Sequence, residues 1–317
     1  MKLLYVFTVA SLSLLVLTVP IQGAEKESGI VSSPPKSQIV NDLYPGLMTG
    51  VLTYAAASEL PQGVLLKAGP LLIDDKDLAE TIAGAPEQMR PKLEKNELFI
   101  LEQVATTKLF LAEARIEAAQ SGEDLSEKDE QATIQDYVRA LVKNVKVSDE
   151  EIISFYNENK DSFGGASMMQ IRPQIEQILL QQKQQEFINE HIRTIGKRMR
   201  VEISATWLKV QAVLAQDNPV DKVRASGRPS LVDFGSTGCV PCEMLAPILD
   251  KLKEKYKRKI DVLVIHVGEE PVLASRYSIQ SIPVQIFFDK TGKEVFRHVG
   301  FFPQEQIEMK FTELGFK

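Results

Sequence analysis

The chain has 317 residues, of which 44% are hydrophobic and 25% are charged, and its formal net charge is -6. A chain of this length is expected to form two ordinary domains, each with its own core. The acidic balance argues against a nucleic-acid-binding protein, because phosphate contacts require clustered Lys and Arg. Nucleic acid is therefore not an expected partner, and the one basic run, Lys251 to Lys259, is interpreted as a solvated helix end.

The first residues have the pattern of an export signal. Lys2 precedes an uncharged apolar stretch from Leu3 to Ile21, and the small residues Gly23 and Ala24 suit a cleavage site. Residues 1–24 are therefore predicted to be a signal peptide, and the protein is expected in the periplasm. An uncleaved membrane anchor is the less favoured alternative, because the apolar run is close to the length that spans a bilayer.

The next segment, residues 25–60, contains turn-forming dipeptides such as Pro34-Pro35 and Pro45-Gly46. This composition predicts an extended, mobile lead-in rather than a packed element. A regular pattern begins at Val64, where two short apolar runs, Val64–Leu66 and Leu71–Ile73, flank a Gly-Pro turn and predict a hairpin. The first domain is therefore expected to begin at residue 61.

Helical periodicity dominates the following part of the chain. Apolar residues recur every three or four positions over 86–119, which predicts a long amphipathic helix, and a second helix is expected after Ser126. A third helix is expected from Ser148, because Ser148 and Glu151 have the spacing of a capping box.

A fourth long helix is predicted from about Arg172 to Gly196, with Pro173 tolerated in its first turn. The residues Val201-Glu202-Ile203 that follow are a candidate strand. Residues 61–205 are therefore predicted to be one mainly α-helical domain, and residues 206–217 a linker.

This helical pattern resembles the N-terminal chaperone domain of periplasmic SurA-type proteins. The resemblance rests on Val147-Ser148-Asp149-Glu150-Glu151-Ile152, on Phe155-Tyr156, on Phe163 and on the long helix from Ile171 to Ile195. That family commonly carries a prolyl isomerase domain before its last helix, but here only Gly164 to Met169 precedes the helix. The resemblance therefore implies a role in holding unfolded chains, without isomerase activity. A plain helical bundle that spaces or dimerises the protein is the alternative.

The second domain is expected to begin at Asn218, which with Pro219 predicts the capped start of a short helix. An apolar strand is predicted over Ser230–Phe234, and the helix that Cys239 opens follows a Gly-Ser-Thr-Gly loop. Further strands are expected over 260–267, 284–288 and 294–298, and helices over 271–277 and 303–314.

The chain has two cysteines, Cys239 and Cys242, in a Cys-Val-Pro-Cys motif at the expected start of a helix. Unpaired amides and the positive end of the helix dipole stabilise a thiolate there, so Cys239 is the expected nucleophile and Cys242 the resolving thiol. Half of a zinc site and a purely structural disulfide are weaker alternatives, because no further cysteine exists and so small a loop constrains the unfolded chain little. No metal and no cofactor are therefore expected.

Residues 218–317 resemble the thioredoxin superfamily. The resemblance rests on Val232-Asp233-Phe234, on Cys239-Val240-Pro241-Cys242, on Pro247, on Ser281-Ile282-Pro283 and on Gly300. It implies an α/β thioredoxin fold, a cis bond between Ile282 and Pro283 beside the cysteines, and pairing of the Ile282 backbone with a substrate strand. It also implies that Asp233 is a buried carboxylate of raised pKa that accepts the proton of Cys242. An ordinary strand-end Asp is the alternative.

Three positions depart from the thioredoxin pattern. Gly238 stands where thioredoxins usually have Trp, Glu243 where a cation is common, and Val264 where a lysine often faces the buried Asp. A carboxylate at Glu243 disfavours a nearby thiolate, and the loss of Trp opens the rim above Cys239, so both changes bear on redox potential and substrate choice.

Together these features predict an exported thiol–disulfide oxidoreductase that acts on protein disulfides or thiols, more as a reductant than as an oxidant. A reductase of this kind needs a membrane electron donor for its recycling. Two alternatives remain open. One is a periplasmic chaperone with an auxiliary redox module, and the other is a disulfide isomerase, which requires a homodimer.

Overall fold

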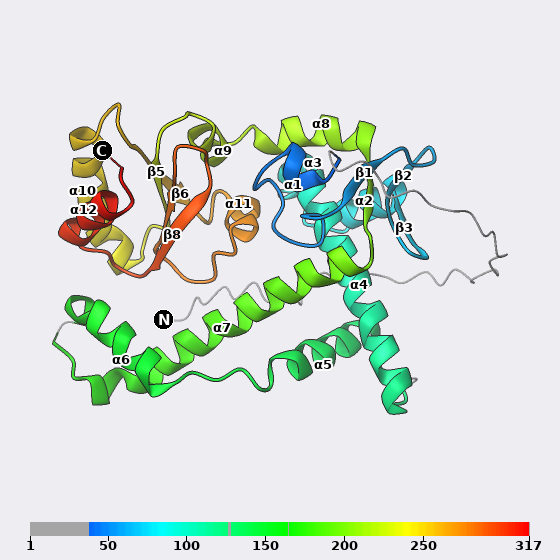
Figure 1. Ribbon diagram of the computed structural model, residues 1–317, viewed down its shortest axis with the longest axis horizontal. Coiled ribbons are helices and arrows are strands. Elements are labelled where there is room, and N and C mark those ends of the chain that lie inside the picture. Colours follow the sequence, from blue (N-terminus) through cyan, green and yellow to red (C-terminus); the bar gives the residue numbers. More distant parts are fainter. Residues whose placement is uncertain (1–37, 126–127, 164, 317) are drawn as a thin grey trace. The chain divides into compact units, whose positions relative to one another are not determined.

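We describe the protein from a computed structural model, which covers residues 38–125, 128–163 and 165–316 (Figure 1). The predicted signal peptide, residues 1–24, and the first part of the lead-in lie outside the described residues. The chain divides into two compact units, one from the residues up to Leu109 with Arg193–Ala212, the other from Phe110–Ile192 with the residues from Val213 onward. Within the described ranges, no helix is both long and apolar enough to cross a membrane.

The first unit contains a four-stranded sheet in the order β1-β4-β2-β3. Strand β1 (Ala56–Ser58) runs parallel to β4 (Glu202–Ser204), whereas β2 (Val64–Ala68) is antiparallel to both β4 and β3 (Leu71–Asp74). The β2–β3 pair confirms the predicted hairpin, and β4 confirms the candidate strand. Strand β1 escaped prediction because Ala56, Ala57 and Ser58 are small residues without the β-branched side chains that favour a strand.

The lead-in is packed, not extended, from residue 38 to residue 60. It forms the short helix α1 (Val40–Leu43), and Val40, Leu47, Val51 and Leu52 are all buried. The prediction of a mobile segment is therefore wrong for this part of the chain. Its Pro and Gly residues shape a compact turn that buries apolar side chains, which outweighs the preference of such dipeptides for open loops.

Two contacts hold this turn in place. Glu102, which is only 3% exposed, accepts hydrogen bonds from the amides of Gly50 and Leu52 at 3.0 and 3.1 Å. Gly196 lies so close to Val51 that a Cβ atom there would stand 2.3 Å from the Val51 carbonyl oxygen. Helix α7 (Met168–Arg198), which contains Gly196, therefore requires glycine at this position.

The helices that follow the hairpin are α2 (Asp75–Ala83), α3 (Arg90–Glu94), α4 (Glu97–Ser121), α5 (Glu130–Val142), α6 (Asp149–Glu158), the short 3₁₀ turn Lys160–Phe163, α7 (Met168–Arg198) and α8 (Ala205–Gln216). The helix predicted over 86–119 is thus divided into α3 and α4. The segment expected to be a linker, residues 206–217, forms α8. The region is mainly helical, as predicted, with the small sheet in addition.

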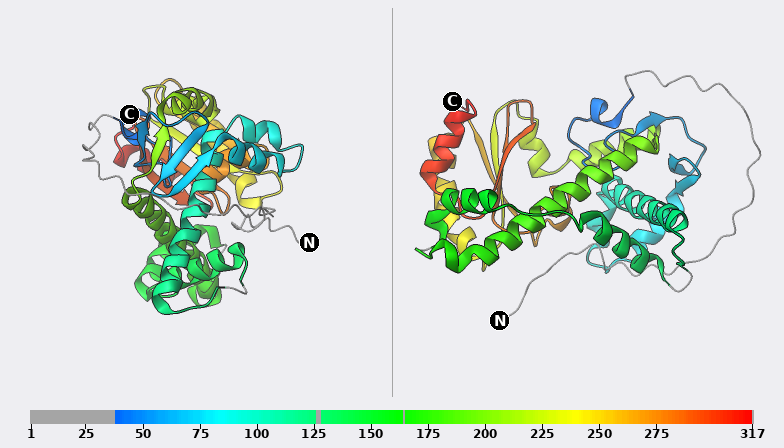
Figure 2. Two further views of the ribbon diagram at one scale, coloured as in Figure 1. Left: turned by 90° about the vertical axis from the view of Figure 1, so that its right-hand side faces the viewer. Right: turned by 60° about the horizontal axis from the view of Figure 1, so that its bottom comes forward.

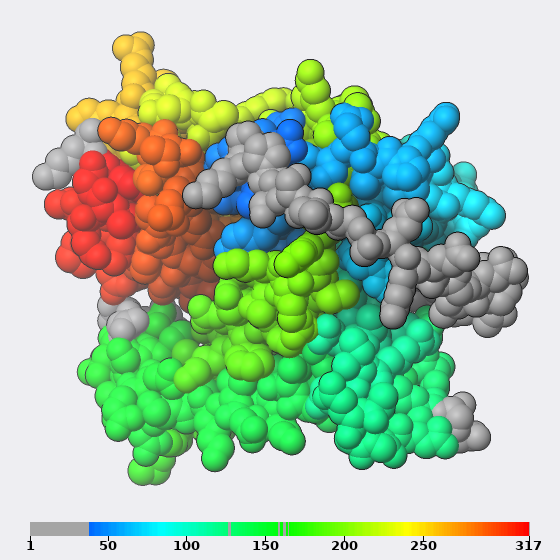
Figure 3. All heavy atoms as spheres, turned by 45° about the vertical axis from the view of Figure 1, so that its right-hand side comes forward, coloured from blue at the N-terminus to red at the C-terminus, as the bar shows by residue number. Residues whose placement is uncertain are grey.

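The start of α6 has the predicted capping box. The Glu151 amide donates to Ser148 Oγ, and the Glu151 carboxylate accepts from the Ser148 amide. Lys183 of α7 also donates to Glu151, at 2.7 Å, which joins the two helices at their surface, coloured green in Figure 3. Because all these groups are partly solvated, the ion pair adds little to stability.

Helix α7 begins earlier than predicted, so Pro173 lies inside it and not in its first turn. The Gln170 side chain accepts a hydrogen bond from the Ser167 amide at 2.8 Å, which stabilises the earlier start. Pro173 removes one backbone hydrogen bond from the helix, and the following turns continue without a break.

The C-terminal part of the second unit alternates helices and strands in the order α9 (Pro219–Arg224), β5 (Ser230–Gly235), α10 (Val240–Lys255), β6 (Asp261–His266), α11 (Pro271–Arg276), β7 (Val284–Phe288), β8 (Glu294–Val299) and α12 (Gln304–Glu313). Its sheet has the order β6-β5-β7-β8, with β5 parallel to β6 and antiparallel to β7. These elements confirm the ones predicted from the sequence.

Alternate residues of β5 face two separate cores. Leu231 packs with apolar residues of α10 and α12, which lie along one face of the sheet (Figure 2). Val232 and Phe234 pack with Val220 of α9 and Leu273 of α11 on the opposite face. Since Asp233 shares the side of Leu231, it points toward α10.

A buried ion pair joins α9 to α11. Asp221, 8% exposed, accepts from Arg276 Nη1 at 2.5 Å and from Arg224 Nη1 at 2.9 Å. Asn218 caps α9 by accepting from the Asp221 amide, as the sequence predicted. One carboxylate therefore pairs with two guanidinium groups that have little access to water.

Replacing Asp221 by Ala is expected to lower the free energy of unfolding by about 3–5 kcal/mol, because it leaves buried guanidinium charge without its counter-ion. Chemical denaturation followed by circular dichroism measures this loss. The control is Asp217→Ala, which breaks an exposed pair with Lys222 and is expected to cost about 1 kcal/mol or less. Equal losses in the two variants would contradict the prediction.

Candidate active site

The cysteine pair lies where β5 passes into α10. Cys239 is the N-cap residue of α10, and it forms a disulfide with Cys242 across a Cα–Cα distance of 5.2 Å. Pro241 occupies the first turn, where a missing amide hydrogen breaks no helical bond. The helix thus begins at the pair, as predicted, which places Cys239 at the N-terminal end of α10, where the helix dipole favours a thiolate.

The two sulfurs differ in access to solvent. Cys239 is half-buried, whereas Cys242 is only 8% exposed. Val240 and Met244 expose 68% and 54% of their surface beside them, which gives the opening an apolar rim. A substrate disulfide can therefore reach Cys239, whereas Cys242 is shielded from the substrate and contacts groups inside the protein.

The loop before β7 lies against the outer cysteine. The Ile282–Pro283 bond is cis, and the Ile282 carbonyl oxygen is 3.9 Å from Cys239 Sγ. The Pro283 carbonyl accepts a hydrogen bond from the Gly300 amide at 2.8 Å, which ties the loop to the end of β8. The predicted substrate-binding residues, Ile282 and Pro283, are thus brought beside the predicted nucleophile.

Asp233 lies in β5 beneath the start of α10. It is 2% exposed, and its Oδ1 atom accepts a hydrogen bond from Gln285 Nε2 at 2.7 Å. Burial raises the pKa of Asp233 from 3.8 to about 6, and the hydrogen bond from Gln285 acts in the opposite direction. Such a carboxyl group can both accept and release a proton near neutral pH.

The glycine at the end of β5 connects this carboxylate with the inner cysteine. A Cβ atom built on Gly235 would lie 3.3 Å from Asp233 Oδ2 and 3.6 Å from Cys242 Sγ. Asp233 and Cys242 therefore border the same small space, which the absence of a side chain keeps open.

Sequence reasoning missed Gly235 and Gln285. Gln285 is the one polar residue in the otherwise apolar strand Val284–Phe288, and it is fully buried. A polar side chain at such a position is the signal that could have drawn attention to it, because a buried amide needs a hydrogen-bond partner.

The three departures from the thioredoxin pattern have clear places in the structure. Gly238 has a φ of 76°, a conformation that favours glycine, and its amide donates to Glu243 Oε1 at 3.1 Å. Glu243 is thus turned back toward the loop before Cys239. Val264 of β6 is in register with Asp233, so an apolar side chain stands next to the carboxylate on that strand.

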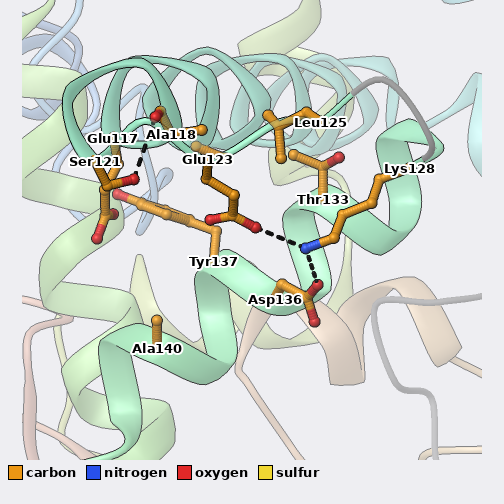
Figure 4. A pocket seen from close by; sticks show the side chains of 11 residues that line it. Glu117, Ala118, Ser121, Glu123, Leu125, Lys128, Thr133, Asp136, Tyr137 and Ala140 are labelled. Atoms are coloured by element: carbon orange, nitrogen blue, oxygen red, sulfur yellow. Dashed lines mark hydrogen bonds and ion pairs between the residues drawn. The ribbon is translucent and has the colours of Figure 1, made fainter.

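Away from the cysteine pair, a hollow of about 100 Å³ lies between the end of α4 and α5 (Figure 4). Lys128 at its edge donates to both Glu123 and Asp136 at 2.8 Å. The hydrogen bond with Asp136 raises the pKa of Lys128, and the same contact lowers the pKa of Asp136. Two carboxylates of the lining thus hold Lys128, and the hollow is explained as a contact between the two helices.

No group of three or more His, Cys, Asp and Glu residues that could hold a metal ion occurs in the part of the chain that the structure describes. The structure places two sulfurs and the carboxyl group of Asp233 at the cysteine pair. A thiol–disulfide exchange needs no more than these groups.

Comparison with known proteins agrees with this geometry. Residues 210–313 match the Thioredoxin family. Thioredoxins of Staphylococcus aureus strains MW2, N315 and USA300 are each 46% identical to this chain over 77 residues, which make up 24% of this chain and 73% of each relative. With its cysteine pair at the head of α10 and a matching sequence around it, the chain belongs to the thioredoxin family, whose chemistry is thiol–disulfide exchange.

Proposed function

We propose that this protein is an exported oxidoreductase that acts on the disulfides of other proteins, more as a reductant than as an oxidant. The observation that carries the proposal is the unequal access to the two sulfurs: Cys239 is half-buried and faces the Ile282 carbonyl, and Cys242 is buried behind it. The Val-Pro pair between the cysteines supports the reducing direction, because it is closer to the dipeptides of reducing family members.

The reaction begins with the reduced protein. The Cys239 thiolate attacks one sulfur of a substrate disulfide, forms a mixed disulfide and releases the other substrate sulfur as a thiolate. Cys242 then gives its proton to Asp233 and attacks Cys239 Sγ. The Cys239–Cys242 disulfide forms, the second substrate thiolate leaves, and two electrons have passed to the substrate.

Recycling of the protein then requires an electron donor. The two electrons must return to the Cys239–Cys242 disulfide, and for an exported protein the donor is a membrane protein that presents a dithiol outside the cytoplasm. The apolar stretch Leu3 to Ile21 supports the export that this proposal requires. N-terminal sequencing of the mature protein, expected to begin just after Ala24, tests it.

A role of the helical region in holding unfolded chains is the second candidate, in keeping with its SurA-type pattern. Ile153 of α6 and Met169 and Phe187 of α7 expose 43%, 87% and 46% of their surface. Exposed apolar side chains of this kind favour contacts with unfolded segments. A disulfide isomerase would further require a dimer, and sedimentation of the full chain as a monomer would exclude that alternative.

Replacing Cys242 by Ala is expected to trap substrates as mixed disulfides on Cys239, because the resolving thiol is missing. Adducts are recovered from the native compartment under non-reducing conditions and identified by mass spectrometry. The control is Cys239→Ala, which retains the buried thiol and is expected to yield none. If the Cys242→Ala protein also carries no adduct, the exchange mechanism fails.

The resting state of the pair tests the direction of the reaction. A mostly reduced pair in wild-type cells, measured by thiol alkylation, is expected for a reductant. A mostly oxidised pair would contradict the proposed direction and favour an oxidase.

Asp233→Asn tests the buried carboxyl group. The pKa of Asp233 is higher in the folded protein, about 6, than its ordinary 3.8, so the folded state binds the proton more tightly and loses stability as pH rises between these values. Asn does not ionise. The oxidised variant is therefore expected to match the wild type in stability at about pH 3 and to exceed it by up to about 3 kcal/mol at about pH 8.

Denaturation of both proteins at the two pH values measures this difference. Asp250→Asn, an exposed change on α10, is the control for the loss of a surface carboxylate. The same Asp233→Asn variant is expected to resolve mixed disulfides more slowly at neutral pH, because the proton of Cys242 has lost its acceptor. A stability difference that is the same at both pH values would refute the assignment of the raised pKa.

The chaperone candidate is separated by a variant without cysteines, Cys239→Ala/Cys242→Ala. If the oxidoreductase proposal is correct, this variant does not complement loss of the wild type. Full complementation, together with suppressed aggregation of a cysteine-free client, would make client holding the main function.

A further inference from the structure

Gln285 occupies an unusual position for an amide side chain. It is the second residue of β7 and is 0% exposed, and its neighbours Val284 and Ile286 are also buried. Its Nε2 atom donates to Asp233, but its Oε1 atom has no hydrogen-bond partner among the described residues. A buried amide oxygen without a partner is unfavourable, so stability alone would favour an apolar residue here.

The register of the sheet explains which groups surround the carboxylate. Asp233 stands opposite Gln285 on β7 and Val264 on β6, and His298 of β8 follows in the same row beyond Gln285. From α10, Cys242 approaches the space beside Gly235. Of these neighbours, Gln285 is the one that makes a hydrogen bond to the Asp233 carboxylate.

The two carboxylate oxygens have different surroundings. Oδ1 is bound to the Gln285 amide at 2.7 Å. Oδ2 lies 3.3 Å from the point that a Gly235 Cβ would occupy, and Cys242 Sγ lies 3.6 Å from the same point. Gln285 of β7 therefore holds Oδ1, and Oδ2 lies on the side of Cys242 Sγ.

We propose that Gln285 is a positioning residue for the resolving step, which holds Asp233 Oδ1 so that Oδ2 faces the space shared with Cys242. This inference rests on the proposed exchange reaction and deepens it. In the step itself, the Cys242 proton passes to Oδ2, Cys242 Sγ bonds to Cys239 Sγ, and the bond from Cys239 to the substrate sulfur breaks, releasing a substrate thiolate. Gln285 transfers no proton, but its donated hydrogen bond favours the ionised carboxylate that must accept one.

Gln285→Met tests the proposal with a side chain of similar size that cannot donate a hydrogen bond. Titration of the Asp233 carboxyl carbon by NMR in the oxidised full-length protein is expected to move to higher pH by about one unit. In single-turnover measurements, resolution of the mixed disulfide is then expected to fall about tenfold or more at about pH 5, where fewer Asp233 carboxyl groups are ionised. It is expected to stay below the wild-type rate at about pH 9, where Asp233 is ionised in both proteins and only its orientation differs.

Two further variants locate the effect. In an Asp233→Asn background, Gln285→Met is expected to cause no additional change in rate, since the group that it positions is absent. Gly235→Ala places a methyl group in the shared space and is expected to slow resolution while Cys239 still forms mixed disulfides at the wild-type rate.

An unchanged Asp233 titration in Gln285→Met would overturn the proposal. So would a loss of folding in both Gln285→Met and Gln285→Leu, which would assign the amide to stability. Failure of the proposed function looks different: the Cys242→Ala protein would then carry no mixed disulfides, while the NMR titration would still differ between wild type and Gln285→Met.

Discussion

A single carboxyl group, buried where water cannot solvate its charge, governs the arrangement around the cysteine pair. Asp233 is placed by β5 under the first turn of α10, and burial brings its pKa to about 6. On β6 the residue in register with Asp233 is Val264, whose apolar side chain cannot stabilise the carboxylate charge. On β7 the residue in register is Gln285, whose hydrogen bond lowers the pKa that burial raises. The acidity of the site is thus a balance between desolvation and one donated hydrogen bond.

Much of this domain could be predicted from local sequence. The apolar strand Ser230–Phe234, the cap at Asn218 and the helix opened by Cys239 are all encoded by neighbouring residues, and each was found where expected. The partnership of Asp233 with Gln285 joins residues 52 positions apart and depends on strand register. Local periodicity carries no information on register between distant strands, so this part of the site needed the structure.

The same distinction between local and distant partners explains two outcomes in the part of the chain before the thioredoxin domain. Ser148 and Glu151 form the predicted capping box because both partners lie within one turn. The packing of residues 38–60 was mispredicted because it depends on distant groups, namely the carboxylate of Glu102 and the bare backbone of Gly196. Composition identifies residues that form turns, but it does not identify the distant residues against which such a turn packs.

The pairing of β1 with β4 has a consequence for biosynthesis. Ala56 is in register with Glu202, so the first sheet joins segments that leave the ribosome or the export channel far apart in time. The intervening helices must emerge before the sheet can close, and the entropy of closing so long a loop delays that event. Helix α9 and the first strand of the thioredoxin domain, β5, follow α8 in the chain. The thioredoxin domain is therefore emerging while the first sheet closes, and the two can fold at nearly the same time.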